Sequence, residues 1–119
     1  MVRIRYVTAA FALMLLAAAP PARAEGFLGA YEDLPLAPGL TEVAGSGVAF
    51  DSPGGRIVEA FAAGSVKASD VLKFYAATLP QLGWRRESDT LYRREAEVLR
   101  LDPTPQGKGV TIRFAVSPE

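Results

Sequence analysis

Four arginines gather in a predicted hairpin, two on each strand, and they are the first residues in this chain that could bind a ligand. A tight turn at residues 88–89 joins the two strands. Arg86 and Arg94 would then stand side by side and could bind an anion such as a phosphate or a carboxylate. The alternative is a solvated hairpin in which glutamates neutralise the arginines. The residues concerned are Arg85, Arg86, Arg93 and Arg94, with Glu87, Glu95 and Glu97.

A second candidate site mixes apolar and charged side chains on one face of a predicted sheet. In the strand over residues 56–63, we expect the small side chains of Val58, Ala60 and Ala62 to face a helix. The opposite face carries Glu59, and a carboxylate is costly to bury without a partner. That face would bind a protein, or it would be an ordinary exposed face with cross-strand ion pairs. Its candidate binding residues are Ile57, Glu59 and Phe61 of this strand, with Arg100 and Arg113 of two later strands.

The chain has no cysteine and no histidine, and this excludes several chemistries. There is no thiol for a disulfide or a zinc site, and no imidazole for serine–histidine catalysis. A hydrolase that uses Asp51, Glu59 or Asp102 is a distant third hypothesis, because no spacing pairs these acids or forms a calcium loop. We therefore expect a protein that is not an enzyme and that holds no metal or cofactor.

Residues 1–24 have the three parts of a secretory signal peptide. Two arginines form a basic start, residues 7–19 are apolar, and residues 22–24 have the small-x-small pattern of a cleavage site. A retained membrane anchor is the alternative, and the apolar run is shorter than the ~20 residues that cross a bilayer. We expect cleavage after Ala24, export to the periplasm and no stable membrane span.

Cleavage would also change the charge of the protein. The full chain has 13 basic and 13 acidic residues, and three arginines would leave with the leader while every acid stays. The remaining chain is thus slightly acidic. Proteins that bind nucleic acid usually show a net basic domain or a basic stripe, so we expect no nucleic-acid partner.

Residues 25–42 are rich in Gly, Pro and Leu and show neither a helical nor a strand period, which predicts an extended N-terminal arm. The arm has too many large apolar residues for a free tail. It would either cover the core of its own domain or grip a partner.

Residues 69–82 favour one amphipathic helix, because its apolar residues recur at spacings of three and four. Ser69 is a candidate N-cap, and Gly83 suits the left-handed residue that ends a helix. Pro80 lacks an N–H and predicts a loosened last turn. The face that packs on the sheet would consist of Val71, Phe74, Tyr75, Thr78, Leu79 and Leu82.

The rest of the chain predicts strands. A turn at residues 51–55 joins the first two, and residues 103–109 read as a loop between the last two. The fold class is therefore α+β, a single domain over residues 43–119 with one helix on an antiparallel sheet, in the order β-β-α-β-β-β-β. The expected strands are residues 43–50, 56–63, 84–87, 91–95, 98–102 and 110–116.

Phe74-Tyr75, then Leu79-Pro-Gln-Leu-Gly-Trp84, and the later strand at residues 110–116 give the chain a resemblance to a known group. It resembles an uncharacterised family of small secreted proteins of Gram-negative bacteria. The resemblance implies an α+β fold and a periplasmic location, and it implies no activity.

The leading hypothesis is a non-catalytic binding or assembly accessory in the periplasm, which contacts an envelope protein through the second candidate site, the arm, or both. The alternative is a small-anion or lipid-binding module that uses the arginine hairpin and any cleft under the helix.

Overall fold

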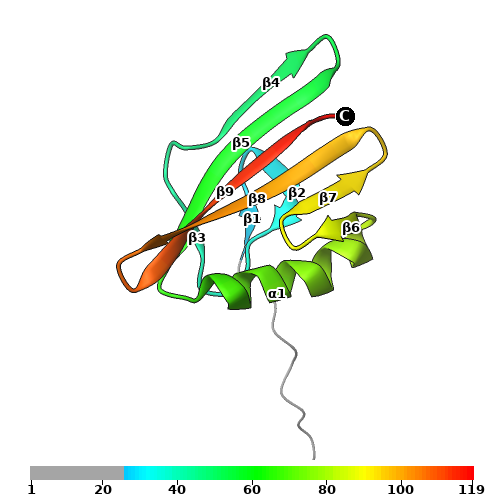
Figure 1. Cartoon of the computed structure of the whole chain (residues 1–119). Coiled ribbons are helices and arrows are strands. Elements are labelled where there is room, and N and C mark those ends of the chain that lie inside the picture. Colours follow the sequence, from blue (N-terminus) through cyan, green and yellow to red (C-terminus); the bar gives the residue numbers. More distant parts are fainter. Residues whose placement is uncertain (1–25) are drawn as a thin grey trace, which may run out of the picture.

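A computed structural model of the protein describes residues 26–119, and the predicted signal peptide lies outside these residues. Nine strands and one α-helix that continues into a 3-10 turn follow one another along this part of the chain (Figure 1). In order they are β1 (Phe27–Leu28), β2 (Tyr31–Pro35), β3 (Thr41–Glu42), β4 (Val48–Ser52), β5 (Gly55–Gly64), α1 (Ala68–Thr78), the 3-10 turn η1 (Leu79–Leu82), β6 (Arg85–Ser88), β7 (Leu91–Arg94), β8 (Glu97–Gln106) and β9 (Gly109–Pro118).

Seven of these strands form one antiparallel sheet in the order β3-β5-β9-β8-β7-β6, with β4 also paired to β5. The hairpin β4–β5 and the meander from β6 to β9 are the pairings that the turn signals predict. The α+β class and the predicted order of elements are therefore confirmed. The structure adds the short strand β3 and a separate hairpin, β1–β2, before the predicted domain.

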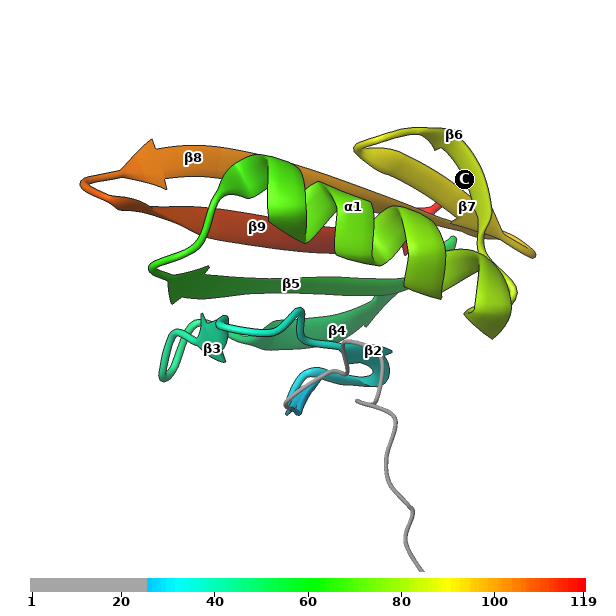
Figure 2. The ribbon, with the colours of Figure 1, turned by 90° about the horizontal axis from the view of Figure 1, so that it is seen from below.

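Helix α1 lies across the central strands on one face of the sheet (Figure 2). Val58, Ala60 and Ala62 are at most 2% exposed and belong to the core that this helix covers, as the alternation along β5 predicts. Their small side chains leave room for Tyr75, which is fully buried and meets the ring of Phe114 edge-on, with 5.7 Å between the ring centroids.

The start of the helix differs from the sequence expectation. The helix begins at Ala68, and Lys67 occupies the N-cap position with an extended backbone and no side-chain cap. The carbonyl oxygen of Lys67 accepts the N–H groups of Asp70 and Val71, so the first turn closes on the backbone. The prediction that Ser69 caps the helix is therefore wrong, because Ser69 already lies within the first turn.

The end of the helix is as predicted. The α-helix stops at Thr78 and continues as a 3-10 turn that contains Pro80, which has no N–H to extend the α-helical pattern. The side-chain amide of Gln81 donates a hydrogen bond to the carbonyl oxygen of Ala77 at 2.9 Å. Gly83 then ends the turn with a left-handed backbone, at a φ of 93°.

The hairpin β8–β9 corrects one prediction. Residues 103–109 are not a loop, because both strands run through this segment to a two-residue turn at residues 107–108. The N–H of Leu101 points toward β7. It donates a hydrogen bond to the carbonyl oxygen of Thr90, the residue that precedes β7. Since backbone direction alternates along a strand, the nitrogens of Pro103 and Pro105 also point to that side, beyond the end of β7, where no ladder bond is lost.

The described part of the arm is folded against the helix side of the sheet. The sequence predicts an extended segment, whereas the structure forms the hairpin β1–β2 there. Gly64 permits this close approach, because a Cβ at that position would lie 2.0 Å from the carbonyl oxygen of Gly39. The arm thus covers its own core, one of the two alternatives. Its buried apolar residues are Leu28, Tyr31, Leu34, Leu36, Ala37 and Leu40.

The hydroxyl of Tyr75 ties the helix to the arm. It donates a hydrogen bond to the carbonyl oxygen of Pro35 at 2.8 Å and accepts one from the N–H of Ala37 at 3.1 Å. All three residues are buried, so each polar group supplies the partner that the others need away from water. Burial raises the pKa of Tyr75, because the phenolate would lose its hydration.

Arg94 of β7 forms a second tie between the arm and the end of the helix. Its Nη1 donates to the carbonyl oxygen of Leu82 at 2.9 Å, and its Nη2 donates to the hydroxyl of Tyr31 at 2.6 Å. The guanidinium also pairs with Asp33 at 2.7 Å and lies 4.4 Å from the ring centroid of Trp84. One side chain therefore contacts the arm, the turn η1 and the residue before β6.

Tyr75→Phe tests the first tie. The ring stays, but the buried N–H of Ala37 and carbonyl of Pro35 lose their partner, so the free energy of unfolding at pH 7 should fall by about 1–3 kcal/mol. Urea unfolding measures this change. The fold is expected to persist, as shown by an unchanged far-ultraviolet circular dichroism spectrum.

The same variant should alter the response to alkali. The pKa of Tyr75 is raised in the folded state above its ordinary value of 10.0, so its contribution is complete below pH 10 and is lost as the pH rises further. Each tyrosine whose pKa is raised by folding lowers the free energy of unfolding by up to about 1.4 kcal/mol per pH unit in this range. Tyr75→Phe should make the loss shallower, although burial also raises the pKa of Tyr31 and Tyr92. An identical slope above pH 10 in both proteins would contradict this account.

Candidate binding surface on the uncovered face of the sheet

The sheet face opposite α1, which we call the groove face, has no covering layer within residues 26–119. Helix α1 and the arm both pack on the other face, where the hydrophobic core lies. On the groove face, Val48 is 49% exposed and Phe50 is 54% exposed. Val48 and Phe50 are therefore the large apolar side chains that this face leaves open to solvent.

A groove of about 340 Å³ runs along this face between β4 and β8. The register places Val48, Glu59, Ala115 and Arg100 in one row across four strands. The methyl group of Ala115 is the smallest side chain in the row, so it forms the floor of the groove. Its lining residues are Val48, Phe50, Ile57, Val58, Glu59, Arg100, Arg113, Ala115, Val116 and Ser117.

The structure brings together most of the residues that the sequence places in the second candidate site. Ile57, Glu59, Arg100 and Arg113 all line the groove. Phe61 is half-buried beside it, in register with Arg113, and does not line the groove. The predicted parity of β5 is thus observed on both faces.

Val48 and Phe50 line the groove but were not predicted as site residues. The sequence contains a usable signal, because the turn before β5 fixes the hairpin register and sets Phe50 opposite Ile57 and Val48 opposite Glu59. The apolar alternation of Val48 and Phe50 across that turn therefore places both side chains on the face of Ile57.

Arg113 and Arg100 differ in their electrostatic surroundings. Arg113 donates from Nε to Glu59 at 2.5 Å and from Nη1 to Asp102 at 2.9 Å. The hydrogen bond with Glu59 is the main reason that the pKa of Arg113 is raised. Arg100 is exposed, and none of the ion pairs found within residues 26–119 involves it. Its charge is available to a carboxylate from outside the chain.

The arginine hairpin is arranged differently from the predicted anion site. Arg85 and Arg93, not Arg86 and Arg94, stand opposite each other. Both pair with Glu87, at 3.8 Å and 3.0 Å, and Arg93 also pairs with Glu119 at 3.3 Å. The carboxylate of Glu87 therefore bridges these two guanidinium groups.

Arg86 and Arg94 each have a carboxylate of their own. Arg86 bonds to Asp89 in the exposed turn, which raises the pKa of Arg86, and Arg94 is held by Asp33 and the arm. Among the glutamates expected to neutralise the hairpin, Glu97 instead pairs with Arg56 at 3.3 Å. Arg85, Arg86 and Arg93 thus pair with acids near the surface, as in the solvated alternative, whereas Arg94 is partly buried against the arm.

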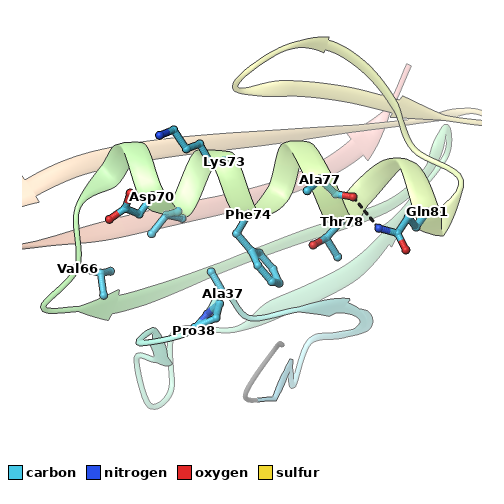
Figure 3. A pocket seen from close by; sticks show the side chains of 10 residues that line it. Ala37, Pro38, Val66, Asp70, Lys73, Phe74, Ala77, Thr78 and Gln81 are labelled. Carbon is cyan, nitrogen blue, oxygen red and sulfur yellow. Dashed lines mark hydrogen bonds between the residues drawn. The ribbon is translucent and has the colours of Figure 1, made fainter. Parts of the chain in front are cut away.

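A larger hollow, which we call the helix groove, lies between α1 and the arm (Figure 3). It has a volume of about 790 Å³, and the ring of Phe74 points into it opposite Ala37 and Pro38. Phe74 is therefore only partly covered, whereas its neighbour Tyr75 is fully buried. Asp70 and Lys73 are the charged side chains at its margin.

The described residues contain no group of three or more metal-ligating side chains, and none of their helices is long and apolar enough to cross a membrane. Two of the acids considered for hydrolysis, Glu59 and Asp102, both accept hydrogen bonds from Arg113.

No protein-family model matches the chain, and neither a curated protein nor a solved structure matches it significantly.

Proposed function

We propose that this protein is a non-catalytic binding or assembly accessory of the periplasm, and that its groove face holds a segment of an envelope protein. The observation that carries the proposal is the groove of about 340 Å³, which has the exposed Phe50 and Val48 at one side and Arg100 at the other, across β5 and β9. Arg100 pairs with no carboxylate within residues 26–119. The export leader predicted at residues 1–24 supports the location.

The groove fits a partner segment of particular chemistry. An apolar side chain would pack on Phe50, Val48 and Ile57 above the methyl group of Ala115, and a neighbouring carboxylate would pair with Arg100. Fully burying a large apolar side chain contributes about 1.5–3 kcal/mol, whereas an exposed ion pair contributes about 0–1 kcal/mol. The apolar contact therefore supplies most of the affinity, and Arg100 favours acidic segments over neutral ones.

A photo-crosslinking amino acid in place of Phe50 tests this proposal in living cells. We expect it to capture one envelope protein, identified by mass spectrometry. The matched control is Phe27, an aromatic residue of the arm that is 59% exposed, where we expect no capture. Capture from Phe27 and none from Phe50 would favour the arm as the binding element and contradict the groove.

Purified partner then allows a quantitative test. Phe50→Ser should weaken binding at least about tenfold, and Arg100→Gln by about two- to fivefold, with the Arg100 effect disappearing at high salt. Titration calorimetry measures both. Unchanged affinity in both variants would show that the captured protein binds elsewhere.

A second candidate function, an apolar-ligand or lipid-binding module, is favoured by one observation, the helix groove. Its volume of about 790 Å³ lies within the range of small-molecule sites, and Phe74, Val66 and Val71 contribute apolar surface to its lining. The arginine hairpin does not support this candidate, because its guanidinium groups are paired with carboxylates of the chain.

Native mass spectrometry of the purified protein tests the second candidate. A lipid that survives purification would appear as a discrete added mass, and Ala77→Trp should remove it by filling the helix groove. A spectrum of the bare protein alone, together with no binding of a fluorescent fatty acid, would remove the support for a lipid-binding module.

A further inference from the structure

Several stretches of the sheet's edge are protected against pairing with another strand. Strand β6, at one edge, is exposed but carries Arg85, Arg86 and Glu87 and has an irregular register. The part of β8 that extends beyond β7 contains two prolines, which cannot donate on that side. Strand β3 has only two residues, and the carboxylate of Glu42 bonds to Gly29 of the arm at 2.8 Å.

Strand β4 contains no proline and pairs with β5 in a regular register. It runs for five residues, Val48–Ser52, pairs with β5 on one side, and has no strand partner on the other side within residues 26–119 (Figure 1). Four of its residues are exposed, and Asp51 carries its only charge. Its unpaired backbone groups therefore form an accessible template for a further strand.

We propose that β4 pairs antiparallel with β4 of a second copy of this chain, with Phe50 of one copy opposite Phe50 of the other. The sheets of the two copies would then join into one sheet across a twofold axis. Edge pairing of this kind takes its affinity from main-chain hydrogen bonds and its specificity from the side chains that meet across it.

The sequence of β4 is complementary to itself in this register. Asp51 of each copy stands opposite Ala49 of the other, so no like charges face each other. Val48 stands opposite Ser52, and the two Phe50 rings meet on the groove face. The pairing would cover part of Phe50, which is 54% exposed in the single chain. These features favour a second copy over an unrelated strand, because β4 has no pattern of charges that would select a different sequence.

The dimer would place two grooves side by side on one continuous face, each with its own Arg100. This inference does not require the proposed envelope partner, although both proposals involve Phe50. The dimer is tested on the purified protein alone, and the partner is identified by a mass that differs from that of a second copy.

Analytical ultracentrifugation of the purified protein tests the pairing. We expect a monomer–dimer equilibrium, and Phe50→Lys should raise its dissociation constant at least about tenfold, because it sets two like charges opposite each other. Phe27→Lys changes an aromatic residue of similar exposure that lies outside β4, and it should leave the equilibrium unchanged. Circular dichroism verifies that each variant is folded.

Single cysteines give a second readout, because the native chain has none. Directly opposed residues bring their Cβ atoms to about 4.5–5.5 Å, close to disulfide geometry, so Phe50→Cys should form a covalent dimer rapidly under oxidation. Phe27→Cys should do so much more slowly. A wild-type protein that stays monomeric over a wide concentration range, or equal rates for the two cysteine variants, would overturn the proposal.

Discussion

The buried hydroxyl of Tyr75 is the contact through which the helix and the arm stabilise each other. A phenol that is fully removed from water needs hydrogen-bond partners, and the arm provides a carbonyl at Pro35 and an N–H at Ala37. The dependence is mutual, because those backbone groups are buried as well. The helix can therefore bury Tyr75 against Ala60 and Ala62 of β5 only when the arm is in place. The arm, in turn, needs the helix in order to fold.

This constraint makes the two faces of the sheet unequal. The helix and the arm together close one face, and Arg94 fastens the end of the helix to the arm through Leu82, Tyr31 and Asp33. The other face and the edge at β4 receive no such cover within residues 26–119. Exposed Phe50 belongs to both of these open regions, so the proposed partner groove and the proposed dimer edge meet at one residue.

Much of this arrangement follows from short-range patterns in the sequence. The alternation of β5 assigned Val58, Ala60 and Ala62 to the helix because only that parity keeps Glu59 near water. The end of the helix follows from Pro80, which has no N–H, and from Gly83, which adopts a left-handed backbone. These effects are local, so the sequence reveals them.

Effects that depend on tertiary neighbours were missed. Pro103 and Pro105 suggested a loop because nothing local shows that β7 ends before them. The arm lacks a period because its residues are ordered by the helix and by Tyr75, not by their own pattern. The prediction that Arg86 and Arg94 stand side by side was wrong, because the register sets Arg85 opposite Arg93. Arg94 is instead held by Asp33 and Tyr31, which are distant in sequence.

Amide hydrogen exchange measured by NMR tests the central claim, that helix and arm order together, most directly. The N–H of Ala37, which bonds to Tyr75, should exchange as slowly as the amides of β5 and β9, because both would open only on global unfolding. If the Ala37 amide instead exchanged orders of magnitude faster than those strands, the arm would be a loosely attached segment, and the mutual dependence of helix and arm would be refuted.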